Sequence, residues 1–490
     1  MWAIAILVCL VAFYVCKRIR NHSSKLPPGP FNIPLLGSWE FIKLYLCDGD
    51  MARMYERLGA RYGPVVFLRV AMDTPVVAIR TYEAIKEASK DLQLGAIGGS
   101  YLYRQMSAWH NLGLSFAEGK NWHDNRRFTI NTLGKLGFTR RKIEPLVAHE
   151  CAMTVQKLTE AAGQPVDSHQ ILPAAALNSI LQLLMSRRFE LDDHQVLRMR
   201  SDSVTLFSIM AKIQTYLDFA PWLNKLAGKD SVSNELNRVM GSFYEFVDQV
   251  IAEHEETFNE DEEPRDLLDA YLAARSQGRT DQDLSRANLR VLMKDLIVGG
   301  LEGPYTTLSW LLLLLAEHRD VQQRVQDELD AAVGADRTPT IEDQHACPLT
   351  LAAIDETLRY VTLTPFNRHF AAAGGATLQG YHIPAGSVIL VDINSLHHDP
   401  AVWGDPDVFR PDRFLGEEGA RLRHRVRGFG LSPRSCPAEP YSRTMLFLFA
   451  AGLLQRMTLR LPDGQQRMTA GQGYSVTLQP GQTMVIGHPR

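Results

Sequence analysis

The chain has 490 residues, enough for roughly two to four domains or one large fold, and it is 45% apolar and 22% charged. This composition is that of an ordinary globular protein, so it argues against a disordered chain, a collagen-like chain and a protein with many membrane spans. The formal net charge of -3 argues against a protein that binds nucleic acid through bulk positive charge, and we expect no nucleic-acid partner.

The first sixteen residues are uncharged and mostly large and apolar, and Lys17, Arg18 and Arg20 follow at once. A cleaved signal peptide would carry its basic residues before the apolar run. The sequence therefore predicts that residues 1–20 form a membrane anchor helix and that the following chain lies in the cytosol. As a helix the run would be roughly 24 Å long, which suits the thinner bilayer of the endoplasmic reticulum.

Behind the anchor, residues 21–34 are predicted to form a proline-rich hinge, because the sequence Leu-Pro-Pro-Gly-Pro at 26–30 suits neither a helix nor a central strand. Later segments with a helical apolar period predict long helices, for example at 203–217, 291–317, 349–360 and 441–454. Short strand-like segments occur at 64–70 and 74–78, and a hairpin is expected from 376–382 and 387–392, joined by Pro-Ala-Gly at 384–386. The expected fold class is mainly α with a small sheet.

Candidate chemistry concentrates near the C-terminus, around Cys436. Pro437 is expected at the first position of the following helix, so that the unpaired N–H groups and the helix dipole would favour a Cys436 thiolate, which can bind a metal ion. A lone cysteine before a helix is weak evidence for such a site. The other five cysteines form no C-x-x-C pair and are expected to be small apolar side chains.

Two upstream motifs add information through their order. Glu356 and Arg359 lie three residues apart on one predicted helix face, where they can pair. The same spacing recurs elsewhere in the chain, so it means little by itself. The segment Phe-Arg-Pro-Asp-Arg-Phe at 409–414 follows and contributes Arg413, and Cys436 comes after both.

In this order the motifs resemble those of the cytochrome P450 family, the haem-thiolate monooxygenases. The resemblance covers the whole chain, with the following motifs: the apolar anchor, the proline hinge, Trp122-x-x-x-Arg126, the acid-bearing helix at 299–302, Glu356-x-x-Arg359, 411–414 and the cysteine loop. It implies that residues 35–490 form a haem-thiolate catalytic domain with the P450 fold. This fold consists of a large helical domain and a small β-rich subdomain. The segments 264–271 and 403–406 resemble the animal microsomal branch.

The resemblance also implies roles around a haem b cofactor. Cys436 would be the axial iron ligand and the metal site, and Phe429 would shield its thiolate from water. Side chains implied for the haem propionates are Trp122, Arg126, His369 and Arg434. A surface role is equally open for His369. Glu356, Arg359 and Arg413 would form a buried charge network that supports the cysteine loop.

The sequence departs from the family pattern in the helix above the expected iron position. Where the pattern has threonine after the acid, this chain has Gly303, and Pro304 is expected to bend the helix. Glu302 is then the catalytic candidate for proton delivery, with Thr306 or Thr307 one turn further on. In the cysteine loop, Ser432 and Ala438 stand where the pattern has glycine.

The implied function is a monooxygenase that hydroxylates a lipophilic small molecule, such as a steroid or xenobiotic, with dioxygen and electrons from NADPH through cytochrome P450 reductase. The enzyme would lie on the endoplasmic reticulum membrane with its catalytic domain facing the cytosol. Two alternatives remain open: a reductase-independent haem-thiolate isomerase or dehydratase, and a haem-containing binding protein without turnover. The sequence Gly303-Pro304 favours both alternatives.

Basic residues near the expected thiolate side favour the reductase-coupled interpretation, because an acidic electron donor could dock there. They form two groups, Arg126, Arg127, Arg140, Arg141 and Lys142, and Arg421, Arg423, Arg425 and Arg427.

Overall fold

The computed structural model describes residues 25–33, 37–48, 51–70, 74–97, 100–137, 142–215, 228, 231–278, 282–430, 433–464, 476–481 and 483–490. The predicted anchor at 1–20, part of the predicted hinge, and Arg140, Arg141 and Ser432 lie outside these residues. None of the helices formed by the described residues is long and apolar enough to span a bilayer.

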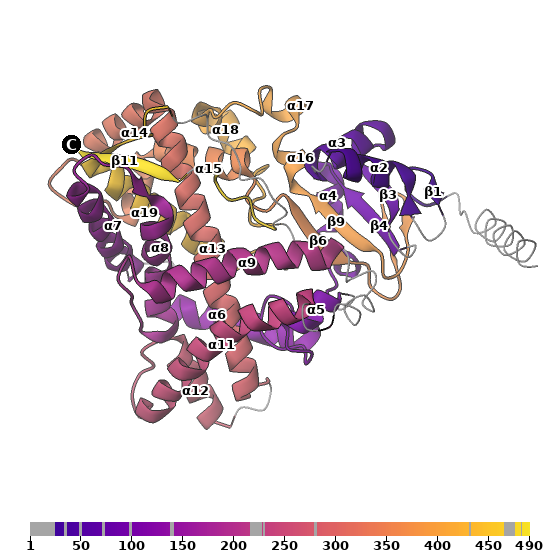
Figure 1. Ribbon diagram of the computed structural model, residues 1–490, viewed down its shortest axis with the longest axis horizontal. Helices are drawn as coiled ribbons and strands as arrows, with labels where there is room; N and C mark the ends of the chain where they lie inside the picture. The colour runs from indigo at the N-terminus through magenta and orange to yellow at the C-terminus, as the bar shows by residue number, and fades with distance from the viewer. Residues whose placement is uncertain are drawn as a thin grey trace, which may run out of the picture.

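Helices make up most of the described chain, and the longest, α13 (Arg286–Glu317), runs through the middle of the helical part of the molecule (Figure 1). The other helices are α2 (Trp39–Asp48), α3 (Met51–Tyr62), α4 (Tyr82–Ala88), α5 (Tyr101–Met106), α6 (Gly119–Lys135), α7 (Ile143–Glu160), α8 (Ser168–Met185), α9 (His194–Thr215), α11 (Val232–Thr257), α12 (Leu267–Ser276), α14 (Arg319–Ala332), α15 (Pro348–Val361), α16 (Ile393–His397), α17 (Pro400–Trp403), α18 (Gly416–Arg423) and α19 (Glu439–Arg456). Short 3-10 helices are η2 (Leu92–Leu94), η4 (Ile341–Ala346) and η5 (Pro411–Phe414).

The largest sheet lies at one end of the molecule together with α2, α3 and α4 (Figure 1). Its strand order is β3 (Val65–Val70), β4 (Thr74–Ile79), β9 (Val388–Asp392) and β6 (Phe366–Phe370). Only β4 and β9 run parallel. The smaller sheets are β10 (Met457–Arg460) with β11 (Met484–Pro489) and β5 (Val166–Asp167), β1 (Asn32–Ile33) with β2 (Gly37–Ser38), and β7 (Ala376–Leu378) with β8 (Tyr381–Ile383). The prediction of a mainly α protein with a small sheet is confirmed.

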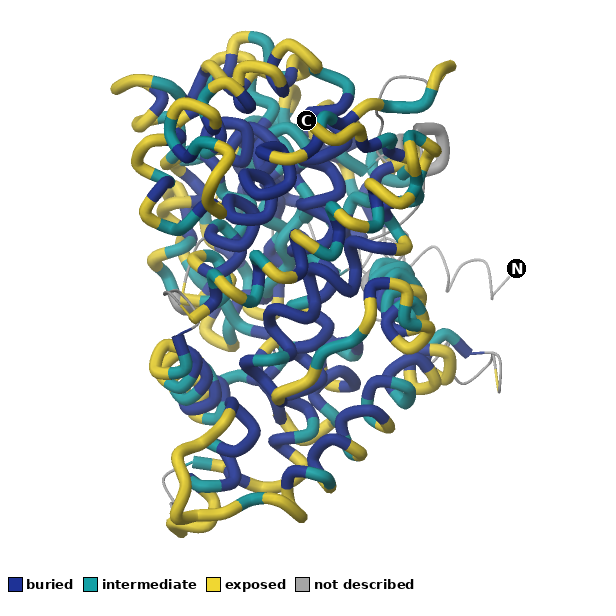
Figure 2. The backbone as a smooth tube through the Cα atoms, turned by 90° about the vertical axis from the view of Figure 1, so that its left-hand side faces the viewer, coloured by how far each residue is buried: buried dark blue, intermediate teal, exposed yellow. Residues whose placement is uncertain are grey.

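The helix α13 is buried on almost all sides, as expected for a helix without a polar face. Figure 2 shows the buried tube running through the interior, with exposed residues at the periphery. The helix continues through Pro304, although proline removes one backbone donor. One turn later, the Thr307 hydroxyl donates to the carbonyl of Gly303 at 2.8 Å. The proline is therefore accommodated within one unbroken helix.

The predicted hairpin between 376–382 and 387–392 is wrong. β7 pairs instead with β8, and β9 pairs with β4 and β6 in the large sheet. The turn between β7 and β8 is formed by Gln379 and Gly380, with φ of 49° and 76°. Positive φ at both central residues is what a two-residue hairpin of type I′ requires. The turn at Gln379 and Gly380 therefore ends β7 and forms the hairpin, before the Pro-Ala-Gly segment that was predicted to form it.

Two buried histidines lie in opposite electrostatic surroundings. His397 accepts the backbone N–H of Arg427 through Nε2 at 2.8 Å, and its Nδ1 lies 2.9 Å from the Thr362 hydroxyl. Burial, followed by the repulsion of His398 and neighbouring arginines, holds the pKa of His397 well below its usual value. It is therefore neutral in the folded protein.

His254 forms an ion pair instead. Its Nε2 lies 2.9 Å from Asp266 and its Nδ1 lies 2.9 Å from the carbonyl of Val250. Burial lowers the pKa of His254, but the hydrogen bond and charge of Asp266 outweigh burial and raise it. Because both ring nitrogens are occupied, the cluster of His254, Asp266 and Asp269 offers no free imidazole lone pair for a metal ion.

We predict opposite effects of His397→Gln and His254→Gln on the pH dependence of stability. A lowered pKa for His397 makes the unfolded chain bind more protons, so its contribution is lost as pH falls below about 6.5. A raised pKa for His254 stabilises the folded state at low pH, and this contribution is lost as pH rises. Between about pH 7.5 and about pH 5.5, His397→Gln should lose less stability than the wild type, and His254→Gln should lose more.

Urea unfolding at the two pH values measures both effects. Glutamine keeps one donor and one acceptor at each site, so each variant removes the titration and retains hydrogen-bonding capacity. Equal pH slopes for the wild type and His397→Gln would contradict a neutral His397.

Candidate functional site

The loop before α19 holds Cys436, but not at the helix terminus as predicted. The helix begins at Glu439, three residues later, and Pro440 lies in its first turn. The pKa of the Cys436 thiol is raised by burial, against smaller opposite effects that include a backbone hydrogen bond to Ala438 and the charge of Arg126. The prediction that Pro437 begins the helix is therefore wrong, whereas a thiolate at Cys436 stays a prediction.

The loop nevertheless leaves Cys436 exposed. Its backbone N–H donates to the carbonyl of Phe429 at 2.9 Å, which closes the loop on itself. Gly430, inside this loop, has φ of 82°, a left-handed value that favours glycine. Cys436 is exposed, although its surroundings are dense enough to raise its pKa by desolvation. The thiol is therefore accessible in the folded protein.

Two arginines lie close to this loop and contact Trp122 of α6. Arg434 stacks on the Trp122 ring with its guanidinium carbon 4.4 Å from the ring centre, and it donates to the carbonyl of Ala117 at 2.8 Å. Arg126 lies 5.8 Å from the same ring centre and donates to the carbonyl of Ser435 at 2.9 Å. The predicted pairing of Trp122 and Arg126 on one helix face is therefore present.

Both guanidinium groups are poorly solvated. Burial lowers the pKa of Arg434 to about 10 and also lowers the pKa of Arg126. Within the described residues, no carboxylate forms an ion pair with Arg126. A cation that has lost water without gaining a counter-ion is a natural partner for an anionic ligand.

An open cleft with an empty volume of about 600 Å³ lies beside the cysteine loop. It is lined by His369 of β6 and by Trp122, Asn367, Pro433 and Arg434. The Nδ1 atom of His369 is buried and has no hydrogen-bond partner among the residues that the structure describes. Burial, followed by the charge of Arg434, lowers the pKa of His369 to about 4. The cleft therefore brings one desolvated cation, Arg434, and one unused imidazole nitrogen together beside the cysteine loop, and Arg126 contacts that loop through Ser435.

These observations fit a haem. The exposed Cys436 thiol would supply an iron ligand, and the arginines and His369 have the donor groups that two propionates require. Phe429 also lies at the loop, where its ring is contacted by the Arg443 guanidinium at 5.4 Å.

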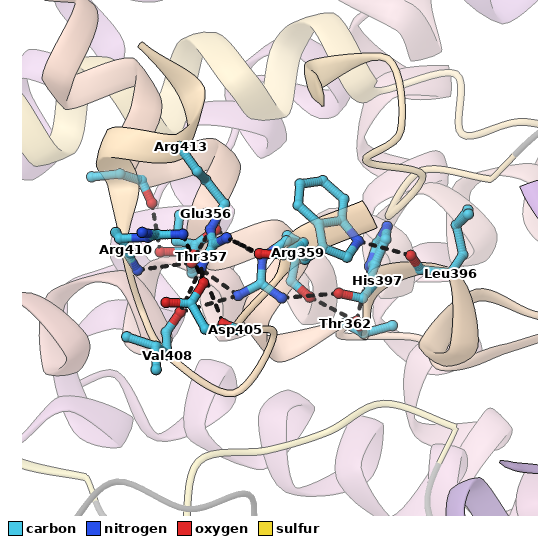
Figure 3. A network of polar contacts seen from close by, with 12 residues as sticks. Glu356, Thr357, Arg359, Thr362, Leu396, His397, Asp405, Val408, Arg410 and Arg413 are labelled. Atoms are coloured by element: carbon cyan, nitrogen blue, oxygen red, sulfur yellow. Dashed lines mark hydrogen bonds and ion pairs between the residues drawn. The ribbon is translucent and has the colours of Figure 1, made fainter. Parts of the chain in front are cut away.

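A buried charge network surrounds Glu356 of α15 (Figure 3). Glu356 and Arg359 of α15 are both fully buried and make two hydrogen bonds, at 2.8 and 2.9 Å. The second arginine, Arg413 of η5, donates to the same carboxylate at 3.1 Å and to the carbonyl of Trp403 at 2.7 Å. One carboxylate therefore holds two arginines from different parts of the chain.

The network reaches the cysteine loop through His397. Arg359 donates to the His397 carbonyl at 2.9 Å, and the ring of His397 accepts the N–H of Arg427. The carbonyl of Arg427 in turn accepts the N–H of Gly430 at 2.9 Å. The position of the loop therefore depends on the Glu356 ion pairs.

Glu302 of α13 is 1% exposed, and its Oε1 accepts hydrogen bonds from Thr477 at 2.9 Å and from Gln479. Burial raises the pKa of Glu302, against smaller opposite effects of Thr477, Arg200 and Gln479. Thr306 contacts Gln479, and Thr307 donates to the helix backbone. Neither has a hydrogen bond to Glu302 among the described contacts.

Sequence reasoning missed Thr477 and Gln479. They lie 175 and 177 residues after Glu302 in the chain, and no local period or motif connects them to it. The two residues lie in a C-terminal stretch, 462–483, that is rich in glycine, glutamine and threonine, so their polarity does not identify a site.

The predicted basic groups are less strongly positive than their sequence suggests. In the second group, Arg423 pairs with Asp355 at 2.9 Å, Arg421 with Glu418 at 3.5 Å and Arg425 with Glu83 at 3.8 Å. In the first group, Arg127 pairs with Asp124 at 3.1 Å.

Comparison with known proteins gives a consistent result. The family model described as Cytochrome P450 matches residues 27–486. Farnesoate epoxidase of Bombyx mori is 29% identical over 100% of this chain and 99% of that protein. Cytochrome P450 2D10 of Mus musculus is 32% identical over 95% of this chain and 93% of that protein. Cytochrome P450 2D6 of Homo sapiens is 29% identical over 100% of this chain and 98% of that protein.

We predict that Arg413→Met lowers the free energy of unfolding by about 3 to 5 kcal/mol, because it leaves part of a buried carboxylate without its partner. The cysteine loop should be affected too, so the amount of haem bound per chain should fall. Arg421→Met is the matched control, because its pair with Glu418 is exposed and contributes little. Urea unfolding and haem content measure the effect. Equal stability of the two variants would mean that the network does not support the loop.

Proposed function

Because the chain belongs to the cytochrome P450 family, whose members are monooxygenases that bind haem b through a cysteine thiolate, we propose that it oxidises a lipophilic small molecule with dioxygen and electrons from NADPH. Hydroxylation of a steroid or xenobiotic is the reaction we favour. The electrons would arrive through an NADPH-dependent cytochrome P450 reductase.

The observation that carries the proposal is the exposed thiol of Cys436 in a loop that two desolvated arginines adjoin, Arg434 on the cleft and Arg126 on Ser435. We assign Cys436 as the iron ligand and Phe429 as the ring that shields it. Trp122, Arg126, His369 and Arg434 would hold the propionates, the arginines by charge-assisted hydrogen bonds. The described ion pairs leave Arg126 without a carboxylate, which supports its role in binding an anion.

When bound, the haem iron supplies the activation of dioxygen, and the thiolate ligand pushes electron density toward it. The protein supplies the surroundings. Glu356, Arg359 and Arg413 hold the cysteine loop, and Glu302 places a buried carboxyl group on α13. A carboxyl group with a raised pKa suits a general acid near neutral pH.

A lipophilic substrate is supported by one relative in particular. Farnesoate epoxidase, by its name, oxidises farnesoate, an apolar chain with one carboxylate. The interior around α13 is strongly apolar in this protein, which suits an apolar substrate.

The second candidate is a reductase-independent isomerase or dehydratase, and the observation that favours it is the missing hydroxyl at Gly303. A haem protein without turnover would be favoured by the same residue. The family relationship and the buried Glu302 carboxyl favour the monooxygenase.

We propose that residues 1–20 anchor the protein in the endoplasmic reticulum membrane, with 21–34 as a hinge and the catalytic domain, 35–490, in the cytosol. The basic residues that follow the apolar run support this orientation. Reductase docking on the side of the cysteine loop is supported by the remaining arginines of that face, such as Arg427. Because several of these arginines are ion-paired, docking should depend only moderately on salt.

We predict that Cys436→Ala abolishes the red-shifted Soret band that the reduced carbon monoxide complex of the wild type shows. The reason is that this band requires a thiolate ligand. Cys347→Ala is the control, since Cys347 is buried and remote from the cleft residues. A wild-type spectrum typical of histidine ligation would contradict the assignment of Cys436.

The same two variants test the reaction. With a library of lipophilic compounds, product formation by the wild type and Cys347→Ala should require NADPH, reductase and dioxygen, and Cys436→Ala should form none. Product formed at the full rate without reductase or dioxygen would overturn the monooxygenase proposal in favour of the isomerase.

Deletion of residues 1–20 should reduce sedimentation with membranes and leave the haem content per chain unchanged, because the cleft residues lie far beyond the hinge in sequence. Ultracentrifugation with microsomes and the absorbance of bound haem measure the two effects. Haem loss from a folded truncated protein would contradict the separate roles of anchor and catalytic domain.

A further inference from the structure

The helix α13 has unoccupied space beside Gly303. A Cβ atom added at Gly303 would meet nothing within 4 Å among the described residues outside its own helix backbone. By contrast, a Cβ at Gly300, one turn earlier, would lie 3.0 Å from the side chain of Ile180. The described atoms therefore leave room for a side chain at position 303.

A hydroxyl group nevertheless reaches Glu302, from the other end of the chain. Thr477 donates to Oε1 of Glu302 at 2.9 Å, and Gln479 donates to the same oxygen. The exposed fraction of Thr477 is 6% and that of Glu302 is 1%, so water cannot easily replace this bond.

The segment 476–481 is held against α13 by further bonds. The indole N–H of Trp310 donates to the carbonyl of Leu478 at 2.9 Å, and the N–H of Leu478 donates to the carbonyl of Leu363 at 2.9 Å. Gln479 also contacts the Thr306 hydroxyl at 3.2 Å. Backbone bonds on both sides of Leu478 therefore position Thr477 and Gln479 independently of Glu302.

The two oxygens of Glu302 are used differently. Oε1 accepts both hydrogen bonds, whereas Oε2 is buried and has no partner in the part of the chain that the structure describes. When such a carboxyl group is protonated, its proton lies on the oxygen that accepts no hydrogen bond. The neighbouring charged and titratable groups are Arg200 of α9 and Tyr305 of α13.

We propose that Thr477 is a positioning residue for proton delivery: its hydroxyl holds Oε1 of Glu302 so that Oε2 carries a transferable proton, in place of the hydroxyl that Gly303 lacks. The inference rests on the proposed monooxygenase function. In the step, the Oε2–H bond breaks and the proton passes to a water molecule on the path to the reacting oxygen. The carboxylate then recovers a proton from solvent.

An infrared experiment tests the positioning without turnover. Spectra of the haem-loaded protein, recorded between about pH 4 and about pH 8, should contain a carboxylic C=O band that is absent from Glu302→Gln. Thr477→Val should shift this band to higher wavenumber, because the C=O loses a hydrogen bond, and Thr477→Ser should restore it. Thr154→Val is the matched control, since the Thr154 hydroxyl is buried and donates to the carbonyl of Glu150 in α7.

Turnover provides the second measurement. Thr477→Val should slow product formation by up to about 100-fold with little change in substrate binding, because the loss falls on a step after binding. Adding a hydroxyl through Gly303→Thr in the Thr477→Val background should recover part of the rate, since the space at 303 is open. If Thr477→Val does not load haem, Thr477→Ala removes the same hydroxyl.

Two results would overturn the inference while leaving the proposed function intact. One is a C=O band that does not respond to the loss of the Thr477 hydroxyl. The other is reductase-dependent product formation at the wild-type rate in Thr477→Val. Product formation by the wild type without reductase would instead overturn the proposed function itself.

Discussion

One carboxylate with two arginines organises the part of this molecule on which the cofactor depends. Glu356 carries a single negative charge in a place without water, and it is shared between Arg359 of its own helix and Arg413 of η5. Ion pairs in such surroundings do little for stability relative to an apolar core, but removing one partner is costly. Their value lies in specifying how separate segments meet. Here they join α15, the segment around Trp403 and the start of the cysteine loop.

The site beside that loop has the opposite character. Glu356 is fully compensated, whereas Arg126 and Arg434 are desolvated, and the described contacts of Arg126 include no carboxylate. A negatively charged ligand that binds at these arginines would therefore also stabilise the folded state. The charge network around Glu356 is therefore complete within the protein, whereas Arg126 is available to a negatively charged ligand.

The sequence predicted the parts of the site that depend on short spacings. Trp122 and Arg126, and Glu356 and Arg359, each lie within one helical turn, so helix geometry alone places them together. It did not predict the partners of Glu302, because Thr477 approaches from a segment whose position is decided by Trp310 and Leu363. It also misjudged the hairpin after β6, where the conformation of Gln379 decided the pairing. Tertiary contacts of this kind leave no periodic signal in the chain.

The open space beside Gly303 has a consequence for substitutions at this position. Outside the helix backbone, no described atom lies within 4 Å of an added Cβ atom, so a hydroxyl-bearing side chain fits there without remodelling the core. Glu302 therefore lies between two positions from which a hydroxyl can be supplied, one on α13 itself and one on the C-terminal segment. This chain uses the second, because Thr477 already donates to Glu302.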